Sequence, residues 1–188
     1  MLAFLIQLPT PVFACDNNIP GYYLNRYVDN NDGTITDKMT NLMWQKCTLG
    51  AVWNNQSESC EVDGDELKIL KFEILQWRDA LERARQNDFA SHSDWRLPNV
   101  KELASIVTPA CMDTVSTSAI ELSIFDYAYM QYWSSTPTRR TIRVQADAET
   151  STYKNTAYAV AFGTPFGRTG ASISSIEEEK AVRLVRNR

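Results

Sequence analysis

The segment Ser93–Leu103, with the sequence SDWRLPNVKEL, constrains the fold more than any other part of the chain. The residues Asp94–Leu97, which include a tryptophan and a leucine, predict a short strand. Pro98 ends that strand because proline has no backbone N–H to donate. Asn99 is a favoured residue at the start of a helix, and Glu102 follows it at the spacing of a capping box. The segment therefore predicts a strand, a sharp break and a capped helix.

The other segments of the chain predict many short strands and one further helix. Strands are predicted at residues 22–29, 34–37, 42–45, 67–72, 131–135, 157–162 and 181–186, and helices at residues 77–86 and 100–107. The polar stretch Thr138–Thr156 predicts either a hairpin or a long loop. Two helices among many strands indicate an α+β fold. A length of 188 residues is ordinary for a single domain with its own core.

The turn segment Asp29–Gly33 has two interpretations. Its carboxylate and amide side chains are ligands that calcium prefers, but the spacing of an EF-hand is absent because Val28 stands five residues before Gly33. Asn, Asp and Gly are also the residues that favour tight turns for reasons of backbone geometry. We therefore expect a turn between two strands and no metal site.

The sequence carries no recognisable catalytic motif. The patterns GxSxG, GxxxxGK[ST] and HExxH are absent. The one histidine, His92, has Ser91 and Asp94 near it in sequence, but a catalytic triad is defined by three-dimensional geometry. The net charge of −4 argues against a general nucleic-acid binder, which needs clustered basic residues. We expect no enzyme activity, no cofactor and no nucleic-acid partner.

The N-terminal residues 1–14 are apolar and uncharged and end in Val12-Phe13-Ala14. This pattern predicts the remnant of an export signal, followed by a single domain over residues 15–188. The apolar run is too short for a membrane span and contains two prolines. We expect an exported protein, located in the periplasm, at the cell surface or outside the cell. The alternative that Cys15 is lipidated stays open.

The four cysteines suit two disulfides in an exported protein. Three connectivities are open in principle. Cys47 and Cys60 flank a polar loop, which favours a local bridge between them and leaves Cys15 to pair with Cys111.

Several segments, in this order, resemble the Lcl C-terminal-like domain family. They are NNDGTITDKMTNLMWQKC, WRDAL, SDWRLPNVKEL, YWSSTP and VRLVR, within about residues 26–186. The resemblance implies a C-type-lectin-like fold with twisted antiparallel sheets, two main helices, long loops and the disulfides Cys47–Cys60 and Cys15–Cys111. The family's named member is a surface adhesin that binds sulfated glycans, so the resemblance also implies a non-catalytic binding scaffold.

The aromatic and arginine residues are expected either to have structural roles or to bind a ligand. Trp44, Trp95 and Trp133 are expected in the core, and Arg96 and Arg183 as partly buried ion-pair donors. The candidate ligand-binding residues are Arg139, Arg140, Arg143, Tyr153, Tyr158 and Phe166, in or beside the segments Thr138–Thr156 and Gly163–Ala171. Arginine with aromatic rings suits a glycan or a surface protein as ligand. The alternative functional hypothesis is a structural or assembly module that oligomerises at the cell surface or in a pilus-type complex.

Overall fold

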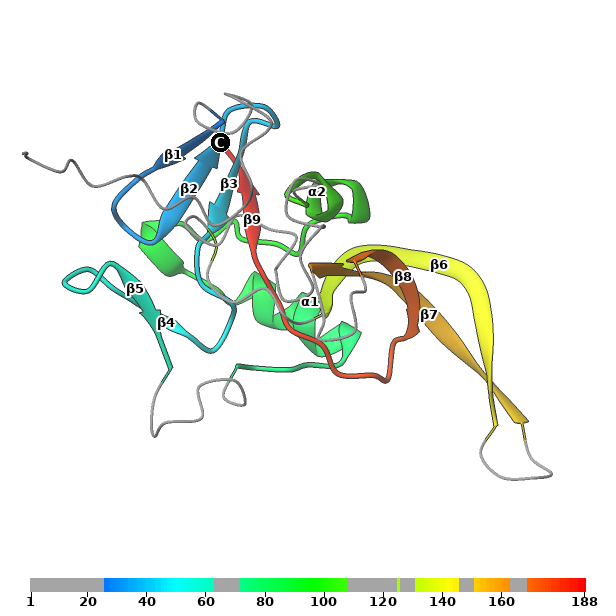
Figure 1. The fold of residues 1–188 in the computed structure, drawn as a ribbon. Helices are drawn as coiled ribbons and strands as arrows, with labels where there is room; N and C mark the ends of the chain where they lie inside the picture. Colours follow the sequence, from blue (N-terminus) through cyan, green and yellow to red (C-terminus); the bar gives the residue numbers. More distant parts are fainter. Residues whose placement is uncertain (1–25, 63–71, 108–124, 126–130, 146–150, 163–168) are drawn as a thin grey trace, which may run out of the picture.

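The computed structural model describes residues 26–62, 72–107, 125, 131–145, 151–162 and 169–188. The strands are β1 (Tyr27–Asp29), β2 (Thr34–Asp37), β3 (Leu42–Gln45), β4 (Val52–Asn54), β5 (Ser59–Glu61), β6 (Gln131–Gln145), β7 (Ser151–Phe162), β8 (Thr169–Ser175) and β9 (Val185–Asn187). The helices are α1 (Trp77–Arg85), the 3-10 turn η2 (Phe89–Ser91) and α2 (Val100–Ser105). Figure 1 shows this arrangement, which confirms the α+β prediction.

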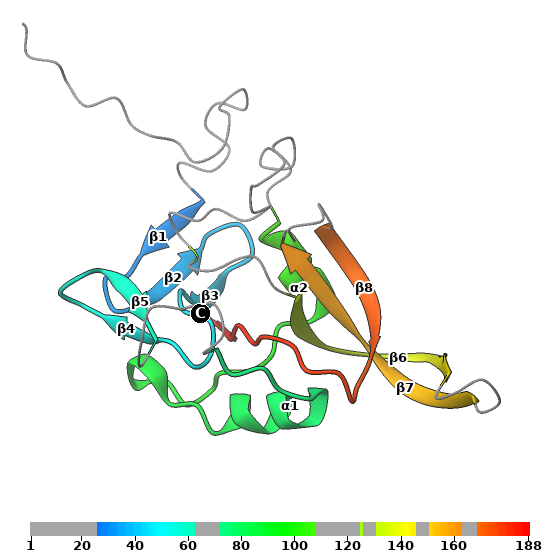
Figure 2. The same ribbon diagram turned by 60° about the horizontal axis from the view of Figure 1, so that its bottom comes forward.

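Three antiparallel sheets contain these strands. Their orders are β1-β2-β3-β9, β4-β5 and β6-β7-β8. In the first sheet Thr34 lies opposite Gln45, and Trp44 lies opposite Val185. Figure 1 and Figure 2 show the sheet β6-β7-β8 between the two α-helices, beside the four-stranded sheet.

The turn between β1 and β2 has the predicted conformation. Asn31 and Gly33 both have positive φ, of 60° and 84°. A Cβ atom at Gly33 would lie 2.6 Å from Cγ of Trp53 and 2.7 Å from Cζ of Phe89. Gly33 is therefore required both by the backbone conformation and by the close approach of two aromatic rings.

The capping box at the start of α2 is confirmed. The Asn99 side chain accepts hydrogen bonds from the backbone N–H groups of Lys101 and Glu102, and the Glu102 carboxylate accepts one from the backbone N–H of Asn99. The predicted strand before it is wrong. Over residues 94–97 only Arg96 makes a β-bridge, with Val185, because the Pro98 break leaves a short crossing rather than a paired strand. The helix ends at Ser105, short of the predicted Val107.

The closing strand is also shorter than predicted. Residues 181–184 do not pair as a strand, and β9 begins at Val185. The carbonyl oxygens of Val182 and Leu184 accept hydrogen bonds from the N–H groups of Leu49 and Gln45, while Ala181 exchanges bonds with β6. This segment therefore crosses between the two larger sheets and joins them. Its alternating pattern reflects burial on both sides rather than membership of one ladder.

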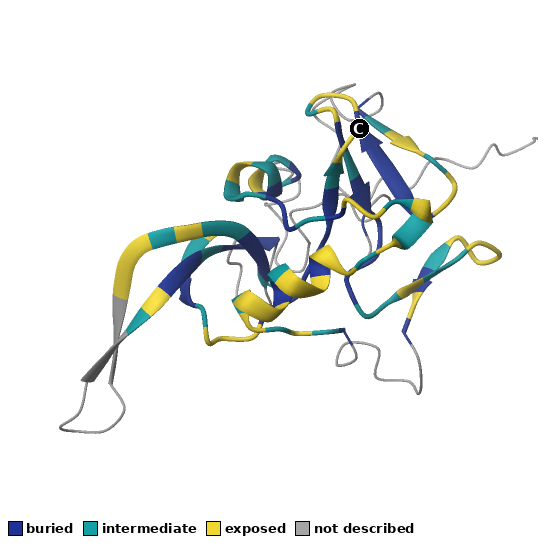
Figure 3. Ribbon diagram, turned by 180° about the vertical axis from the view of Figure 1, so that it is seen from behind, coloured by how far each residue is buried: buried dark blue, intermediate teal, exposed yellow. Residues whose placement is uncertain are grey.

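The core has two parts, one on each face of the sheet β6-β7-β8. Successive residues of β6 contribute to opposite parts: Tyr132 packs with Trp44 and Leu103, and Trp133 packs with Ala80 and other residues of α1. This follows from the alternation of side chains along a strand. Figure 3 shows the buried residues concentrated in the inner strands and the exposed residues on the outer surface of α1. Trp44, Trp95 and Trp133 are all buried, as predicted.

Helix α1 and the disulfide Cys47–Cys60 are both confirmed. Ala80 and Ala84 of α1 are fully buried, and the Trp77 indole donates a hydrogen bond of 2.8 Å to the carbonyl oxygen of Ser134. The disulfide links the end of β3 to β5. Several predictions lie outside the described residues: the disulfide Cys15–Cys111, the export signal at residues 1–14, and residues 67–71 of one strand. No helix in the described ranges is long and apolar enough to cross a membrane.

Candidate binding surface

The β6–β7 hairpin extends beyond β8 and projects from the body of the protein (Figure 1 and Figure 2). β8 pairs with β7 only over residues 156–162. Beyond that point, residues 151–155 of β7 pair with residues 141–145 of β6. We call residues 138–145 and 151–155 the arginine arm. The segment that the sequence left open between a hairpin and a loop is therefore a hairpin.

Threonine side chains hold the base of the arginine arm together. The hydroxyl oxygens of Thr138 and Thr156 lie 2.5 Å apart, and both lie within hydrogen-bond distance of the carbonyl oxygen of Arg140. The strand register shifts on both sides of Pro137, which is exposed at the edge of the sheet. Such irregularities bend and twist a strand, which accounts for the curvature of β6 in Figure 1.

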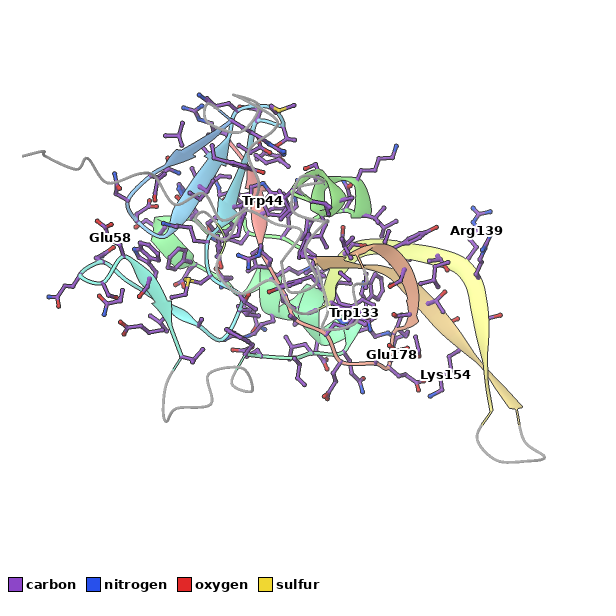
Figure 4. The ribbon with its side chains drawn as sticks, in the orientation of Figure 1. Trp44, Glu58, Trp133, Arg139, Lys154 and Glu178 are labelled. Atoms are coloured by element: carbon purple, nitrogen blue, oxygen red, sulfur yellow. A yellow bond between two sulfur atoms is a disulfide. The ribbon has the colours of Figure 1, made fainter. Side chains whose placement is uncertain are left out.

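Two arginines of the arm present their guanidinium groups to solvent. Arg139 and Arg140 are both exposed, and Figure 4 shows the Arg139 side chain directed away from the body. Among the described residues, no carboxylate forms an ion pair with either group. No carboxylate in the described part of the chain therefore neutralises these two positive charges.

The structure places the other candidate residues at different positions along β6 and β7. Arg143 and Tyr153 are register partners within the arm itself. Tyr158 lies nearer the body, half-buried and opposite Ile173 of β8. Phe166 lies outside the described residues. The hairpin thus brings Arg139, Arg140, Arg143 and Tyr153 onto one element, while Tyr158 belongs to the three-stranded part of the sheet.

Two lysines form charged contacts near the base of the arm. Lys154 forms an ion pair with Glu177. Lys180 is buried and donates hydrogen bonds of 2.8 Å to Gln131 Oε1 and to Glu178 Oε2, with its Nζ 5.1 Å from the Trp133 ring centroid. Figure 4 shows Trp133, Glu178 and Lys154 beside the sheet where the arm begins. Of these contacts, the ion pair of Lys154 with Glu177 joins the arm to the body.

The environment of Glu178 favours the ionised form of its carboxyl group. Burial opposes ionisation of the carboxyl, but the hydrogen bond and the positive charge of Lys180 outweigh it. Together they hold the pKa of Glu178 below its usual range.

A second charged surface, which the sequence analysis missed, lies at the end of the protein opposite the arm. The contact of Gly33 with Trp53 and Phe89 brings three segments together there. Each segment carries exposed carboxylates: Asp32 from the β1–β2 turn, Glu58 and Glu61 from the β4–β5 hairpin, and Asp88 before η2. We call these four residues the acidic end. The concentration of Asp and Glu over residues 58–66 was the signal in the sequence that could have indicated it.

The carboxylates of the β1–β2 turn make the local hydrogen bonds of the predicted turn. The Asp32 carboxylate accepts hydrogen bonds from the backbone N–H and the hydroxyl of Thr34, at 2.9 and 2.6 Å. The Asp29 carboxylate binds Lys46 Nζ at 2.8 Å. Within the described ranges, no group of three or more metal-ligating side chains is present.

The contacts of His92 and the two candidate ion-pair arginines are structural. The His92 ring packs edge-on against Trp95, with centroids 6.2 Å apart. Arg96 forms the predicted ion pair, with Glu102, through two hydrogen bonds of 2.8 Å. Arg183 is fully buried and donates hydrogen bonds to the carbonyl oxygens of Gln45 and Lys46. These residues join the helices and sheets to one another.

Comparison with known proteins identifies a family. The model of the Lcl C-terminal domain matches residues 33–186, which include both α-helices, the Cys47–Cys60 disulfide and the arginine arm. No curated protein and no solved structure matches the chain significantly. Because the match covers most of the chain, this protein belongs to the Lcl C-terminal domain family.

Proposed function

We propose that this chain is an exported, non-catalytic binding or adhesion domain that meets an anionic ligand with the arginine arm. The observation that supports this most directly is the pair of exposed guanidinium groups on a projecting hairpin, with no carboxylate partner in the described part of the chain. A two-stranded hairpin on its own is only marginally stable in water. A bound ligand would therefore stabilise the arm as well as neutralise its charge.

The chemistry of arginine indicates the class of ligand. The planar guanidinium group presents several N–H donors in a geometry that fits carboxylate and sulfate oxygens. Acidic glycans and acidic protein surfaces both carry such groups. The arm is open to water on its exposed side, which suits reversible binding. Bond-breaking chemistry, by contrast, uses sites that exclude water.

A glycan array tests this proposal directly. The array holds sulfated, carboxylated and neutral glycans, and the wild-type protein is compared with the triple variant R139A/R140A/R143A. We expect the wild type to bind acidic glycans and the variant to bind them at least about tenfold more weakly, which corresponds to about 1.4 kcal/mol. The matched control R78A/R85A/K101A removes three exposed charges from the helices and should bind like the wild type.

Two outcomes would contradict the proposal. Equal binding by the wild type and the arm variant would remove the assignment of the arm. Binding by neither protein to any glycan, together with no binding to an acidic protein surface such as polyglutamate, would remove the ligand class.

A structural or assembly role is the second candidate function. One observation favours it: the same chain carries an exposed cationic arm and an exposed acidic end, on opposite sides of the body (Figure 4). Light scattering on the purified protein tests this role. A stable oligomer or a co-purifying partner supports it, and a strictly monomeric protein without a partner contradicts it.

We also propose the finer features that the family implies. These are a C-type-lectin-like arrangement of the sheets, a second disulfide between Cys15 and Cys111, and removal of residues 1–14 on export. Intact mass spectrometry of exported material, with and without reductant, tests the covalent features. Reduction should add the hydrogens of two disulfides to a chain that begins at Cys15. A lipid adduct on Cys15, or two free thiols, would contradict the second disulfide.

A further inference from the structure

Charge is distributed unevenly between the arginine arm and the rest of the chain. The arginine arm and residues 146–150, which join its two strands in the sequence, together contain four basic and two acidic residues, a net charge of +2. The whole chain carries −4, so the remaining residues carry −6. The arm is thus a cationic element on an anionic molecule, and its charge is complementary to the body that bears it.

The acidic end lies where the β1–β2 turn, the β4–β5 hairpin and η2 meet, and it carries part of that negative charge. Asp32, Glu58, Glu61 and Asp88 are all exposed. Over the described residues, none of the four forms an ion pair with a basic side chain. Glu73, Asp94 and Glu102, by contrast, are each paired with an arginine. Asp79 and Glu179 are also exposed and form no ion pair among the described residues, but they lie in other segments of the chain.

The acidic end is also held firmly enough to act as a docking surface. The Cys47–Cys60 disulfide ties β5 to the end of β3. Within the β4–β5 hairpin, Glu61 Oε1 accepts hydrogen bonds from Asn54 Nδ2 at 2.7 Å and from Ser57 Oγ at 2.9 Å. The carboxylate is therefore held in position by neutral donors, and no basic side chain among the described residues forms an ion pair with it.

The arm cannot reach the acidic end of its own molecule. Figure 4 shows Arg139 and Glu58 at opposite ends of the protein, and Figure 2 shows the same separation of the arm from the β4–β5 hairpin in a second view. The two complementary surfaces can therefore meet only between different molecules.

We propose that the arginine arm of one copy docks on the acidic end of a second copy, so that the chain self-associates head to tail. The inference rests on the proposed role of the arm as a binding surface, and it names a second copy as its partner. Such a contact joins two different surfaces, so it leaves an arm and an acidic end unused at the two ends of each assembly. Association therefore continues into open chains or closes into a ring.

The contact has a characteristic dependence on salt. Its charges are exposed in the free protein, and ion pairs between exposed groups are individually weak and are screened by ions. We therefore expect reversible association that grows with protein concentration at low ionic strength and disappears at high ionic strength.

Sedimentation velocity with two complementary variants tests the inference. R139A/R140A removes charge from the arm and keeps the acidic end, while E58Q/E61Q does the reverse and keeps the hydrogen-bond acceptor at position 61. At about 20 mM salt the wild type should form species larger than a dimer, and these should dissociate at about 500 mM salt. Each variant alone should lose at least about tenfold in association constant. An equimolar mixture of the two should form dimers and nothing larger, because it contains one intact pair of surfaces.

Matched controls make the result specific. R78A/K101A and D79N/E179Q change the net charge by the same amounts at exposed positions on other elements, and both should associate like the wild type. A wild type that is monomeric at low salt would overturn the inference, as would a mixture of the two variants that stays monomeric while the wild type associates. The proposed function is tested separately, since E58Q/E61Q has an intact arm and should still bind the acidic glycans of the array.

Discussion

At the scale of single residues, Asp37 is the clearest case of a charge that the fold controls. Its carboxylate is fully buried and accepts hydrogen bonds from Arg26 Nε at 3.0 Å and from the terminal guanidinium nitrogen at 2.6 Å. Burial opposes its ionisation, but the bonds from Arg26, Thr40 and the backbone of Met39 outweigh this, so the pKa of Asp37 lies below its ordinary value of 3.8. The folded state therefore favours the ionised form more than the unfolded chain does.

This predicts a loss of stability in acid. Because the pKa is lower in the folded state, the ionised carboxylate stabilises the fold fully above the unfolded pKa, and the contribution is lost as the pH falls through the folded pKa. Asp37→Asn should lower the free energy of unfolding near pH 7 by about 3 kcal/mol, since it removes the carboxylate charge that the buried Arg26 guanidinium contacts with two hydrogen bonds. Urea denaturation between pH 7 and pH 2 checks both effects. The prediction fails if the variant and the wild type lose stability equally in acid. Arg83→Ala, which breaks an exposed pair with Glu73, should cost less than about 1 kcal/mol.

At the scale of elements, two glycines distinguish the cost of a steric contact from the cost of a strained backbone conformation. Gly33 and Gly170 both have positive φ, of 84° and 106°. A Cβ at Gly33 would collide with Trp53 and Phe89, whereas a Cβ at Gly170 would meet no atom within 4 Å. A substitution at Gly33 therefore adds a packing cost to the conformational one, and it disturbs the contact that assembles the acidic end.

Gly33→Ala should consequently destabilise the protein more than Gly170→Ala. We expect a loss of about 1 kcal/mol for Gly170→Ala from the positive φ alone, and of about 3 kcal/mol for Gly33→Ala from strain and overpacking together. Urea denaturation of the two variants measures the difference. Equal losses would show that the aromatic rings move aside without cost.

At the scale of the whole molecule, the Cys47–Cys60 disulfide connects the β4–β5 hairpin to the four-stranded sheet, across a sequence separation of 13 residues. Cross-linking a loop of this length restricts the unfolded chain and stabilises the fold by about 3 kcal/mol in the chain-entropy account. The disulfide therefore supports the stability of the domain and also the position of the acidic end.

Cys47→Ala/Cys60→Ala should accordingly change two properties. The midpoint of urea denaturation should fall in proportion to a loss of about 3 kcal/mol. Self-association at low salt should weaken as well, because the β4–β5 hairpin loses its covalent attachment to the body. Denaturation and sedimentation velocity on the same sample measure both. An unchanged denaturation midpoint would mean that the fold holds this hairpin without the bond.

Local features of the fold could be predicted from the sequence because they depend on residues close together in the chain. The turn Asn30–Gly33, the capping box of Asn99 and Glu102, and helix α1 each involve contacts over a few residues. The closing strand was predicted too long because its pairing depends on distant partners. Val182 and Leu184 have the alternation of a strand, but their carbonyl groups bond to Leu49, after β3, and to Gln45, at the end of β3, and they form no continuous ladder.

The arginine arm and the acidic end likewise depend partly on local sequence and partly on tertiary structure. The sequence alone determined the residue types: arginines over 139–143, acidic residues over 58–66, and cysteines spaced for a local disulfide. Only the tertiary structure decided that the arginines lie on a projecting hairpin, because strand pairing between β6 and β7 depends on backbone partners that side-chain polarity does not reveal. The acidic end arises where Gly33, Trp53 and Phe89 pack together from three separate segments. Contacts between such distant residues are set by how the sheets and helices pack, so no local pattern in the sequence specifies them.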